Sequence, residues 1–171
     1  MRPICFLFVA LLFCGFRSEE PSGIRFFSGS WQEVLLEAKR QNKPIYVDFY
    51  TNWCPPCRRM AFEAFPNVAI GAKFNERFVN YQVNAEIGEG VTLAKRYAVQ
   101  SYPTALYLLP TGEVVHKAVG YAGVNAMLQQ ADMVFSMREV RRSRRKRMPS
   151  DDAMLSATPK PVDSTKADSL K

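Results

Sequence analysis

The chain has few of the residues that hold metal ions or cross-link a fold. Its 171 residues include one histidine and four cysteines. One histidine excludes a histidine-rich metal cluster, and four cysteines allow only a small redox or metal site. Hydrophobic residues make up 47% and charged residues 23%. This composition excludes a collagen, a coiled-coil rod and a wholly disordered chain, and the length suits one domain with additional segments.

Excess charge of one sign is also scarce over most of the chain. The formal net charge is +7, but residues 24–137 carry only +2 of it, whereas residues 138–147 carry +6. The basic excess belongs mainly to one short segment, which argues against a nucleic-acid-binding body. Residues 148–171 are rich in Pro, Ser, Asp, Lys and Ala. We expect this tail to be disordered, because it has too few large apolar groups to bury.

No apolar run is long enough to cross a bilayer comfortably. Residues 4–16 are almost wholly apolar and follow Met1-Arg2-Pro3, but a spanning helix needs about 20 residues. We interpret residues 1–18 as a secretory signal peptide, which predicts a periplasmic or secreted protein. A retained N-terminal membrane anchor is the alternative. A lipoprotein box ending at Cys14 is disfavoured because the large Phe13 precedes the cysteine.

Removal of the signal peptide leaves two cysteines, Cys54 and Cys57. A Cys-x-x-Cys pair can be a redox dithiol, half of a zinc site or part of a haem attachment. Zinc needs four ligands, and only His116 could add to the pair. Haem attachment needs a histidine directly after the motif, where Arg58 stands. A redox dithiol remains, and the predicted export, together with the strand and helix described below, supports it.

The body of the chain alternates predicted helices and strands. Ser30 and Glu33 form a capping-box pattern at the first helix, and Pro66 breaks a later one. We expect helices near residues 31–41, 57–65, 68–74, 91–97 and from 125, and strands at 45–50, 78–84, 104–109 and 114–119. Early crossovers predict parallel pairing and the last hairpin antiparallel pairing. The expected fold is α/β, with a central mixed sheet flanked by helices on both faces.

The cysteine pair follows the strand at 45–50 and opens the next helix. Free N–H groups and the positive helix end at that position stabilise a thiolate. We expect Cys54, the first and more exposed cysteine, to attack disulfides. Cys57, one turn into the helix, then resolves the mixed disulfide.

The residues around this pair resemble the thioredoxin active-site signature. Phe49-Tyr50-Thr51-Asn52-Trp53-Cys54-Pro55-Pro56-Cys57 matches it. Val47-Asp48-Phe49 and Ser101-Tyr102-Pro103-Thr104 stand where that family has its buried aspartate and its cis-proline loop. The stretch from Lys43 to Cys54 looks most like exported thioredoxin-like domains, such as the C-terminal domain of the disulfide reductase DsbD. The resemblance covers about residues 24–137, within a domain that we place at 19–137.

The resemblance implies a role for each matching residue. Cys54 and Cys57 would form the redox disulfide, with no cofactor and no metal. Asp48 would be a buried carboxylate beneath Cys57 that relays protons, rather than a structural aspartate. Pro103 would be cis, not an ordinary trans turn proline, and would hold the backbones of Tyr102 and Thr104 for pairing with a substrate strand. Trp53 would pack beside Cys54 and limit access to it.

The sequence departs from the family pattern in two ways. A lysine usually lies near the buried aspartate, and Asn80 is the best match for that place. The dipeptide between the cysteines is Pro55-Pro56, which has no N–H groups. We therefore expect the pKa of Cys54 to stay nearer the ordinary value of about 8.5, which favours a reductase. Arg58 and Arg59, if not simply solvated, oppose this effect.

We therefore expect an exported thiol–disulfide oxidoreductase that reduces protein disulfides. Its partners would be disulfide-containing exported proteins and a thiol electron donor, either membrane-embedded or soluble, with no nucleic acid. The basic residues Arg141–Arg147 are either a solvated helix end or a contact with an anionic surface. Two other functions stay open: a binding or chaperone module with a passive disulfide, and an adaptor that acts through its basic C-terminal tail.

Overall fold

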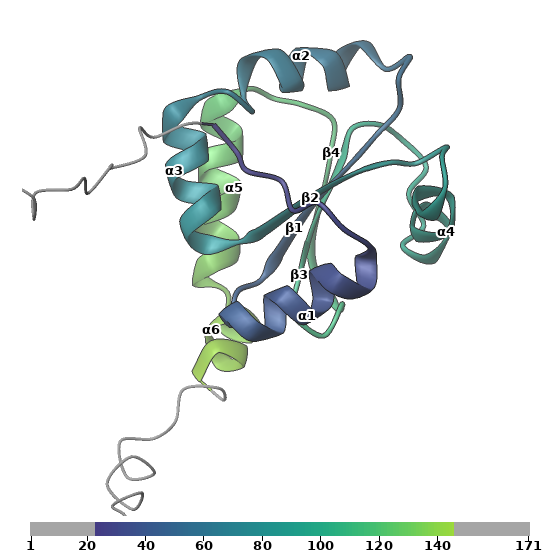
Figure 1. Cartoon of the computed structure of the whole chain (residues 1–171). Coiled ribbons are helices and arrows are strands. Elements are labelled where there is room, and N and C mark those ends of the chain that lie inside the picture. Colours follow the sequence, from purple (N-terminus) through teal and green to yellow (C-terminus); the bar gives the residue numbers. More distant parts are fainter. Residues whose placement is uncertain (1–22, 146–171) are drawn as a thin grey trace, which may run out of the picture.

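The computed structural model describes residues 23–145, which form a four-stranded sheet with helices packed around it (Figure 1). The elements are α1 (Trp31–Gln41), β1 (Ile45–Tyr50), α2 (Pro55–Glu63), α3 (Val68–Arg77), β2 (Val79–Asn84), α4 (Glu89–Arg96), β3 (Thr104–Leu108), β4 (Val114–Val119), α5 (Val124–Ser136) and α6 (Arg138–Arg145). The predicted signal peptide and the predicted tail at 148–171 lie outside the described residues. None of the helices within 23–145 has the length and hydropathy to span a bilayer.

The strand order is β2-β1-β3-β4, so β1 is an inner strand. It pairs in parallel with β2 and antiparallel with β3, and β4 continues the sheet antiparallel to β3. The register places Asp48 of β1 opposite Gln82 of β2 and Ala105 of β3. The predicted mixed sheet and α/β fold class are confirmed.

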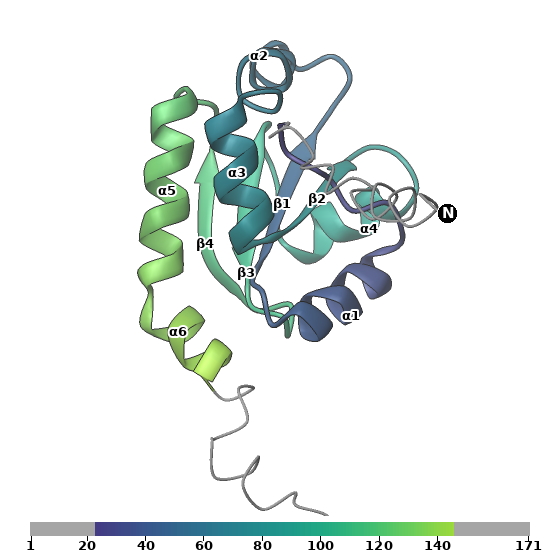
Figure 2. The same ribbon diagram turned by 60° about the vertical axis from the view of Figure 1, so that its left-hand side comes forward.

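Helices cover both faces of the sheet, as Figures 1 and 2 show. One core contains the buried side chains of α1 and α4, and the other contains those of α2, α3 and α5. Val47 and Phe49 of β1 belong to the first core, whereas Tyr46 belongs to the second. Because side chains alternate along a strand, Asp48 lies on the Tyr46 face, toward α2.

The helix boundaries follow local signals in the sequence. The Ser30 hydroxyl accepts the Glu33 N–H at 3.4 Å, and the Glu33 carboxylate accepts the Ser30 N–H at 2.7 Å, so the predicted capping box is confirmed. The predicted break at Pro66 is also confirmed. α2 ends at Glu63, and Asn67 caps α3 by accepting the N–H groups of Ala69 and Ile70.

The segment before α1 lies along the outer edge of β2. Phe26 forms a parallel bridge with Asn80, and the Phe27 N–H donates to the Asn80 carbonyl at 2.7 Å. Asn75 accepts the Arg25 N–H at 2.8 Å and donates to the Gly23 carbonyl at 3.1 Å. These bonds cover part of a strand edge that would otherwise expose unpaired N–H and C=O groups.

The basic segment forms its own helix rather than the end of the preceding one. α5 ends at Ser136, and Met137 is extended with ψ 143° before α6 begins at Arg138. Val140 explains the change of direction, because its side chain is buried in the core between the sheet, α3 and α5. The basic segment is therefore not simply a solvated helix end, because the buried Val140 holds this helix against the body.

Candidate active site

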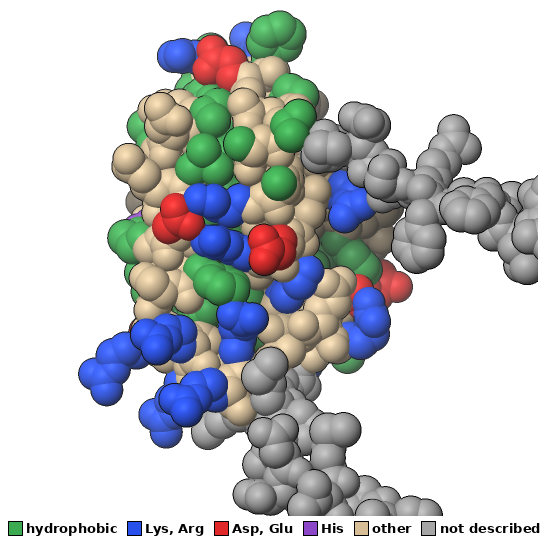
Figure 3. Space-filling model, turned by 90° about the vertical axis from the view of Figure 1, so that its left-hand side faces the viewer, with side chains coloured by type: hydrophobic (Ala, Val, Ile, Leu, Met, Phe, Trp, Pro, Cys, Tyr) green, Lys and Arg blue, Asp and Glu red, His purple; other side chains and the backbone are tan. Residues whose placement is uncertain are grey.

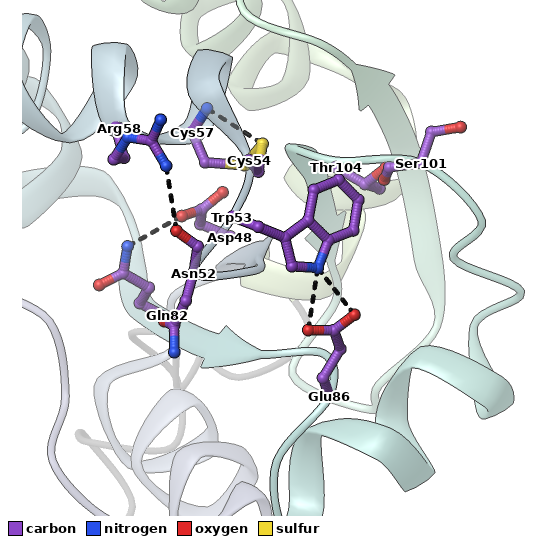
Figure 4. Close-up of a disulfide and its surroundings, with 10 residues drawn as sticks. All are labelled: Asp48, Asn52, Trp53, Cys54, Cys57, Arg58, Gln82, Glu86, Ser101 and Thr104. Atoms are coloured by element: carbon purple, nitrogen blue, oxygen red, sulfur yellow. Dashed lines mark hydrogen bonds between the residues drawn. A yellow bond between two sulfur atoms is a disulfide. The ribbon is translucent and has the colours of Figure 1, made fainter.

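The two cysteines form a disulfide at the N-terminus of α2 (Figure 4). Cys54 is the N-cap residue of the helix, and Pro55 occupies the first helical position, where a proline removes no helical hydrogen bond. The Cys57 N–H donates to the Cys54 sulfur at 3.2 Å. This contact would stabilise a thiolate at Cys54 after reduction, because it combines an N–H donor with the positive end of the helix.

Burial does not distinguish the two cysteines in the disulfide form. Cys54 is 2% exposed and Cys57 is 4% exposed. The expectation that Cys54 is the more exposed cysteine is wrong for this state. The two sulfurs differ instead in hydrogen bonding, since the Cys54 sulfur accepts the helical N–H. That asymmetry still favours Cys54 as the thiolate.

Asp48 lies below the disulfide in the middle of the sheet (Figure 4). Its side chain is 1% exposed, and its Oδ2 accepts a hydrogen bond from Gln82 Nε2 at 3.0 Å. The Oδ1 atom is buried with no partner among the described residues. Burial raises the pKa of Asp48 to about 7, although the bond from Gln82 lowers it in part. A carboxyl with a pKa near neutrality can both accept and release a proton at physiological pH.

Gln82 is a site residue that our sequence analysis missed. The parallel register pairs Asp48 with Gln82 and pairs Tyr46 with Asn80, so the expectation that Asn80 faces Asp48 is wrong. Asn80 instead donates to the Arg25 carbonyl at 3.3 Å and to Asn75 at 3.1 Å. A register alignment of the two strands could have found Gln82, because it lies two residues after Asn80 on the same face.

Trp53 stands at the exposed rim of the site. Its side chain is 62% exposed, and its ring packs edge-to-face against Tyr102 at 6.0 Å between centroids. The indole N–H donates to both carboxylate oxygens of Glu86, at 3.0 and 3.1 Å (Figure 4). A bond from Asn84 to Asn52 at 3.1 Å ties the same two loops together. Glu86 was not predicted, because only the fold brings its loop beside Trp53.

The segment 101–104 lies next to this rim. The Tyr102–Pro103 peptide bond is cis, and Pro103 is buried. Thr104 is the buried first residue of β3, with Phe49 and Val119 as its register partners, and its hydroxyl donates to the Ser101 carbonyl at 2.7 Å. Tyr102 is the partly exposed member of the loop, while substrate pairing at this loop stays a prediction.

The two arginines after the motif have partners of their own. Arg58 donates to the Asn52 carbonyl at 3.1 Å, and Arg59 forms an ion pair with Glu63 at 2.8 Å. The charge of Arg59 is therefore largely offset, whereas Arg58, one residue after Cys57, forms no salt bridge with any of residues 23–145. No group of three or more His, Cys, Asp or Glu side chains within residues 23–145 could hold a metal ion.

A model of the thioredoxin-like domain matches residues 31–134. The chain belongs to the thioredoxin-like family. Its cysteine pair and its relatives identify it as a thiol–disulfide oxidoreductase. As in other members of this family, the redox group is the disulfide itself.

The relatives of this thioredoxin-like chain include both thioredoxins and proteins assigned to disulfide isomerisation. Thioredoxin H4 of Arabidopsis thaliana is 38% identical over 90 residues, which cover 53% of this chain and 71% of the relative. The solution structure of a candidate disulphide-isomerase from Bacteroides thetaiotaomicron is 37% identical with a TM-score of 0.61, covering 70% of this chain and 99% of that one. A thioredoxin from Thermus thermophilus is 25% identical with a TM-score of 0.60, covering 67% and 88%. The DsbD C-terminal domain of Neisseria meningitidis, at 22% identity and a TM-score of 0.52, shares the fold over 60% of this chain and 90% of that one.

Proposed function

We propose that this oxidoreductase is exported and reduces disulfides in secreted or periplasmic proteins. Two features support the proposal: the signal-like residues 1–18 and the donor-poor active-site turn. The alternative within the same chemistry is oxidation or isomerisation, the activity named for the Bacteroides relative. The direction of electron flow depends on how strongly the protein stabilises the Cys54 thiolate.

The reaction begins with the reduced protein. The Cys54 thiolate attacks one sulfur of a substrate disulfide and releases the other substrate sulfur as a thiolate, which takes up a proton. Asp48 then accepts the proton of Cys57, whose thiolate attacks Cys54 and releases the second substrate thiol. The substrate disulfide has gained two electrons, and Cys54–Cys57 has become a disulfide. A thiol donor, soluble or membrane-embedded, must then return two electrons to the pair.

We infer a reductase from the hydrogen bonding at the Cys54 sulfur. Strong oxidants of this chemistry stabilise the attacking thiolate, so that the reduced form is favoured. Here Pro55 and Pro56 have no N–H, and the N–H donor at the Cys54 sulfur comes from Cys57. One helical donor stabilises the thiolate less than several would. The reduction potential of the Cys54–Cys57 pair should therefore stay low.

The reduction potential of the Cys54–Cys57 pair tests this direction. The chain that begins at Glu19, in which Cys54 and Cys57 are the two cysteines, is equilibrated in glutathione and dithiothreitol buffers, and the reduced fraction is measured by thiol alkylation. We expect a value near the thioredoxin figure of about −270 mV. A value near about −120 mV would identify an oxidase or isomerase and would overturn the argument from Pro55 and Pro56.

A trapping variant separates the enzyme from a binding module with a passive disulfide. Cys57→Ser leaves Cys54 able to attack but removes the resolving thiol, so mixed disulfides with exported proteins should accumulate. The matched control is Cys54→Ser, which should trap far less. Equal, low trapping by both variants would favour the passive module. Glutamine at the exposed Arg138, Arg141 and Arg142 should leave disulfide reduction intact while the buried Val140 is kept, whereas an adaptor that acts through its basic tail would lose its function.

Export has its own test. Mass spectrometry of the protein from the cell envelope or medium should show a chain that begins near residue 19. A chain that retains residues 1–18 and stays with membranes would instead support the N-terminal anchor.

A further inference from the structure

Helix α6 displays an unusual density of uncompensated positive charge. Five of its eight residues are arginines, and Glu139 is its one acidic residue. The side chains of Arg138, Arg141, Arg142 and Arg145 are exposed. None of these four makes a salt bridge within residues 23–145. By contrast, Lys73 and Arg77 on the neighbouring α3 both pair with Asp132 of α5, at 2.7 and 2.6 Å.

This helix is held firmly against the body. Val140 is 1% exposed and belongs to the same core as α3 and α5. The Arg144 carbonyl accepts a hydrogen bond from Asn42, the C-cap residue of α1, at 2.9 Å. The Arg144 guanidinium lies 4.4 Å from the centroid of the Phe135 ring. The other four arginines therefore project from a fixed platform, which we call the α6 arginine surface (Arg138, Arg141, Arg142 and Arg145).

The spacing of these arginines is unfavourable for an isolated helix. Arg138 lies three and four residues before Arg141 and Arg142, and Arg145 follows them at the same spacings. Like charges at these spacings destabilise a helix. Glu139 is the one acidic residue of the helix, and none of the four arginines forms a salt bridge within residues 23–145, so an external anion would relieve this repulsion.

The α6 arginine surface and the disulfide occupy opposite ends of the molecule. α2, which carries the cysteines, lies at the top of both Figure 1 and Figure 2, and α6 lies at the bottom of both. Those two views differ by a rotation about the vertical axis, so the separation along that axis is real. Figure 3 shows Lys and Arg side chains projecting together from the end of the body formed by α6.

We propose that the α6 arginine surface docks this protein on an anionic lipid membrane, with the Cys54–Cys57 site directed away from the bilayer. Each cation near such a surface contributes about 1 kcal/mol of attraction. The arrangement lets a membrane-held enzyme meet disulfides in soluble proteins. The proposal is independent of the direction of electron flow and uses the proposed export only to choose among polyanions.

Membrane lipid fits this surface better than nucleic acid. The cations lie on one short helix at a pole of the molecule, so they can meet a plane of headgroups together. The body of the chain, residues 24–137, carries a net charge of only +2, and it would offer little to a nucleic acid that extends beyond α6. The proposed export would also separate this surface from intracellular nucleic acid.

Vesicle binding by the full chain tests the proposal. Sedimentation is measured with phosphatidylcholine vesicles and with vesicles that also contain phosphatidylglycerol. Any insertion of the apolar residues 1–18 contributes equally to binding of both kinds of vesicle. The difference in affinity between them therefore measures the electrostatic contribution. We expect tighter binding to the anionic vesicles. Substituting Arg138, Arg141 and Arg142 with glutamine should weaken that binding about 100-fold, since each cation contributes about fivefold.

A variant with the same loss of charge elsewhere is the matched control. Lys95, Arg96 and Lys117 changed to glutamine should bind the anionic vesicles nearly as well as the unmodified chain. Equal weakening in both variants would show that only net charge matters and would overturn the proposal. Tighter binding to duplex DNA than to the anionic vesicles at the same salt, lost in the α6 variant, would overturn it in favour of nucleic acid.

The orientation has a separate readout. Dithiothreitol is uncharged and should reduce Cys54–Cys57 at nearly the same rate in free and vesicle-bound protein, because the disulfide faces solution in both. A rate that falls about tenfold on binding would show that the site is covered by the membrane and would contradict the proposed orientation. Insulin reduction by the α6 variant in solution should be unchanged, so failure of the docking proposal is distinguishable from failure of the proposed enzyme function.

Discussion

The Asp48 carboxyl is held in the sheet with one oxygen bonded to Gln82 and the other without a hydrogen-bond partner among residues 23–145. Burial raises its pKa from 3.8 to about 7, so the folded chain retains a proton that the unfolded chain loses from about pH 4 upward. The contribution of this carboxyl to stability is therefore most favourable below pH 4 and declines as the pH rises toward 7. From below pH 4 to above pH 7, this contribution to the free energy of unfolding falls by about 4 kcal/mol.

Asp48→Asn removes this titration and keeps an acceptor for Gln82. We expect the free energy of unfolding to rise by about 2 to 4 kcal/mol at pH 8 and to change little at pH 4. Urea unfolding of the oxidised protein at both pH values measures the effect. A gain of the same size at pH 4 and pH 8 would show that Asp48 does not titrate in this window. Slower resolution of the mixed disulfide should accompany the gain in stability.

Glu86 positions Trp53 through the bond to its indole N–H. We expect Glu86→Ala to lower kcat/KM for insulin reduction about fivefold, because an exposed hydrogen bond to a charged group is worth about 1 kcal/mol. Glu86→Gln keeps an acceptor and should retain most of the activity. Glu113→Ala, on an exposed turn, is the control. Equal activities for the Glu86 and Glu113 alanine variants would exclude a role for Glu86 in placing Trp53.

At the scale of single elements, α4 packs too closely on the end of β2 for any side chain at Gly90. A Cβ there would lie 1.8 Å from the Asn84 carbonyl oxygen and 2.8 Å from Val83. Gly90→Ala should therefore lower the free energy of unfolding by about 1 to 3 kcal/mol, although alanine favours helix formation. Thr92→Ala on the exposed side of the same helix should be neutral or stabilising. Thermal unfolding measures the stability of both variants. A Gly90→Ala variant more stable than the unmodified protein would contradict the close packing.

The elements that could be predicted from the sequence are those with a local signal. The apolar run at 45–50 predicted the central strand because such runs are buried on both faces. The separate helix α6 had no such signal, because one buried residue, Val140, orients it and the rest is polar. Within the site, the cysteine pair and Asp48 were recognisable from spacing and context. Gln82 and Glu86 were not, because strand register and loop proximity exist only in the folded chain.

At the scale of the whole molecule, the disulfide and the fold are thermodynamically linked. A dithiol of low potential favours its oxidised form, and the native state therefore gains stability when Cys54 and Cys57 are joined. We expect the Tm of the oxidised protein to exceed that of the reduced protein by about 4 °C. Calorimetry with and without dithiothreitol measures this difference. A more stable reduced form would instead identify an oxidant.

The segment before α1, which runs along the edge of β2, also determines how much of the N-terminus the fold can lose to proteolysis. Phe26 forms a parallel bridge with Asn80 at that edge, and the Phe27 N–H donates to the Asn80 carbonyl. A fragment that starts after Phe27 would present an open strand to its neighbours, and open strands recruit further copies of themselves. The opposite edge, β4, carries Lys117, the kind of charge that discourages such pairing. Proteolysis within the few residues before α1 would therefore make this protein prone to aggregate.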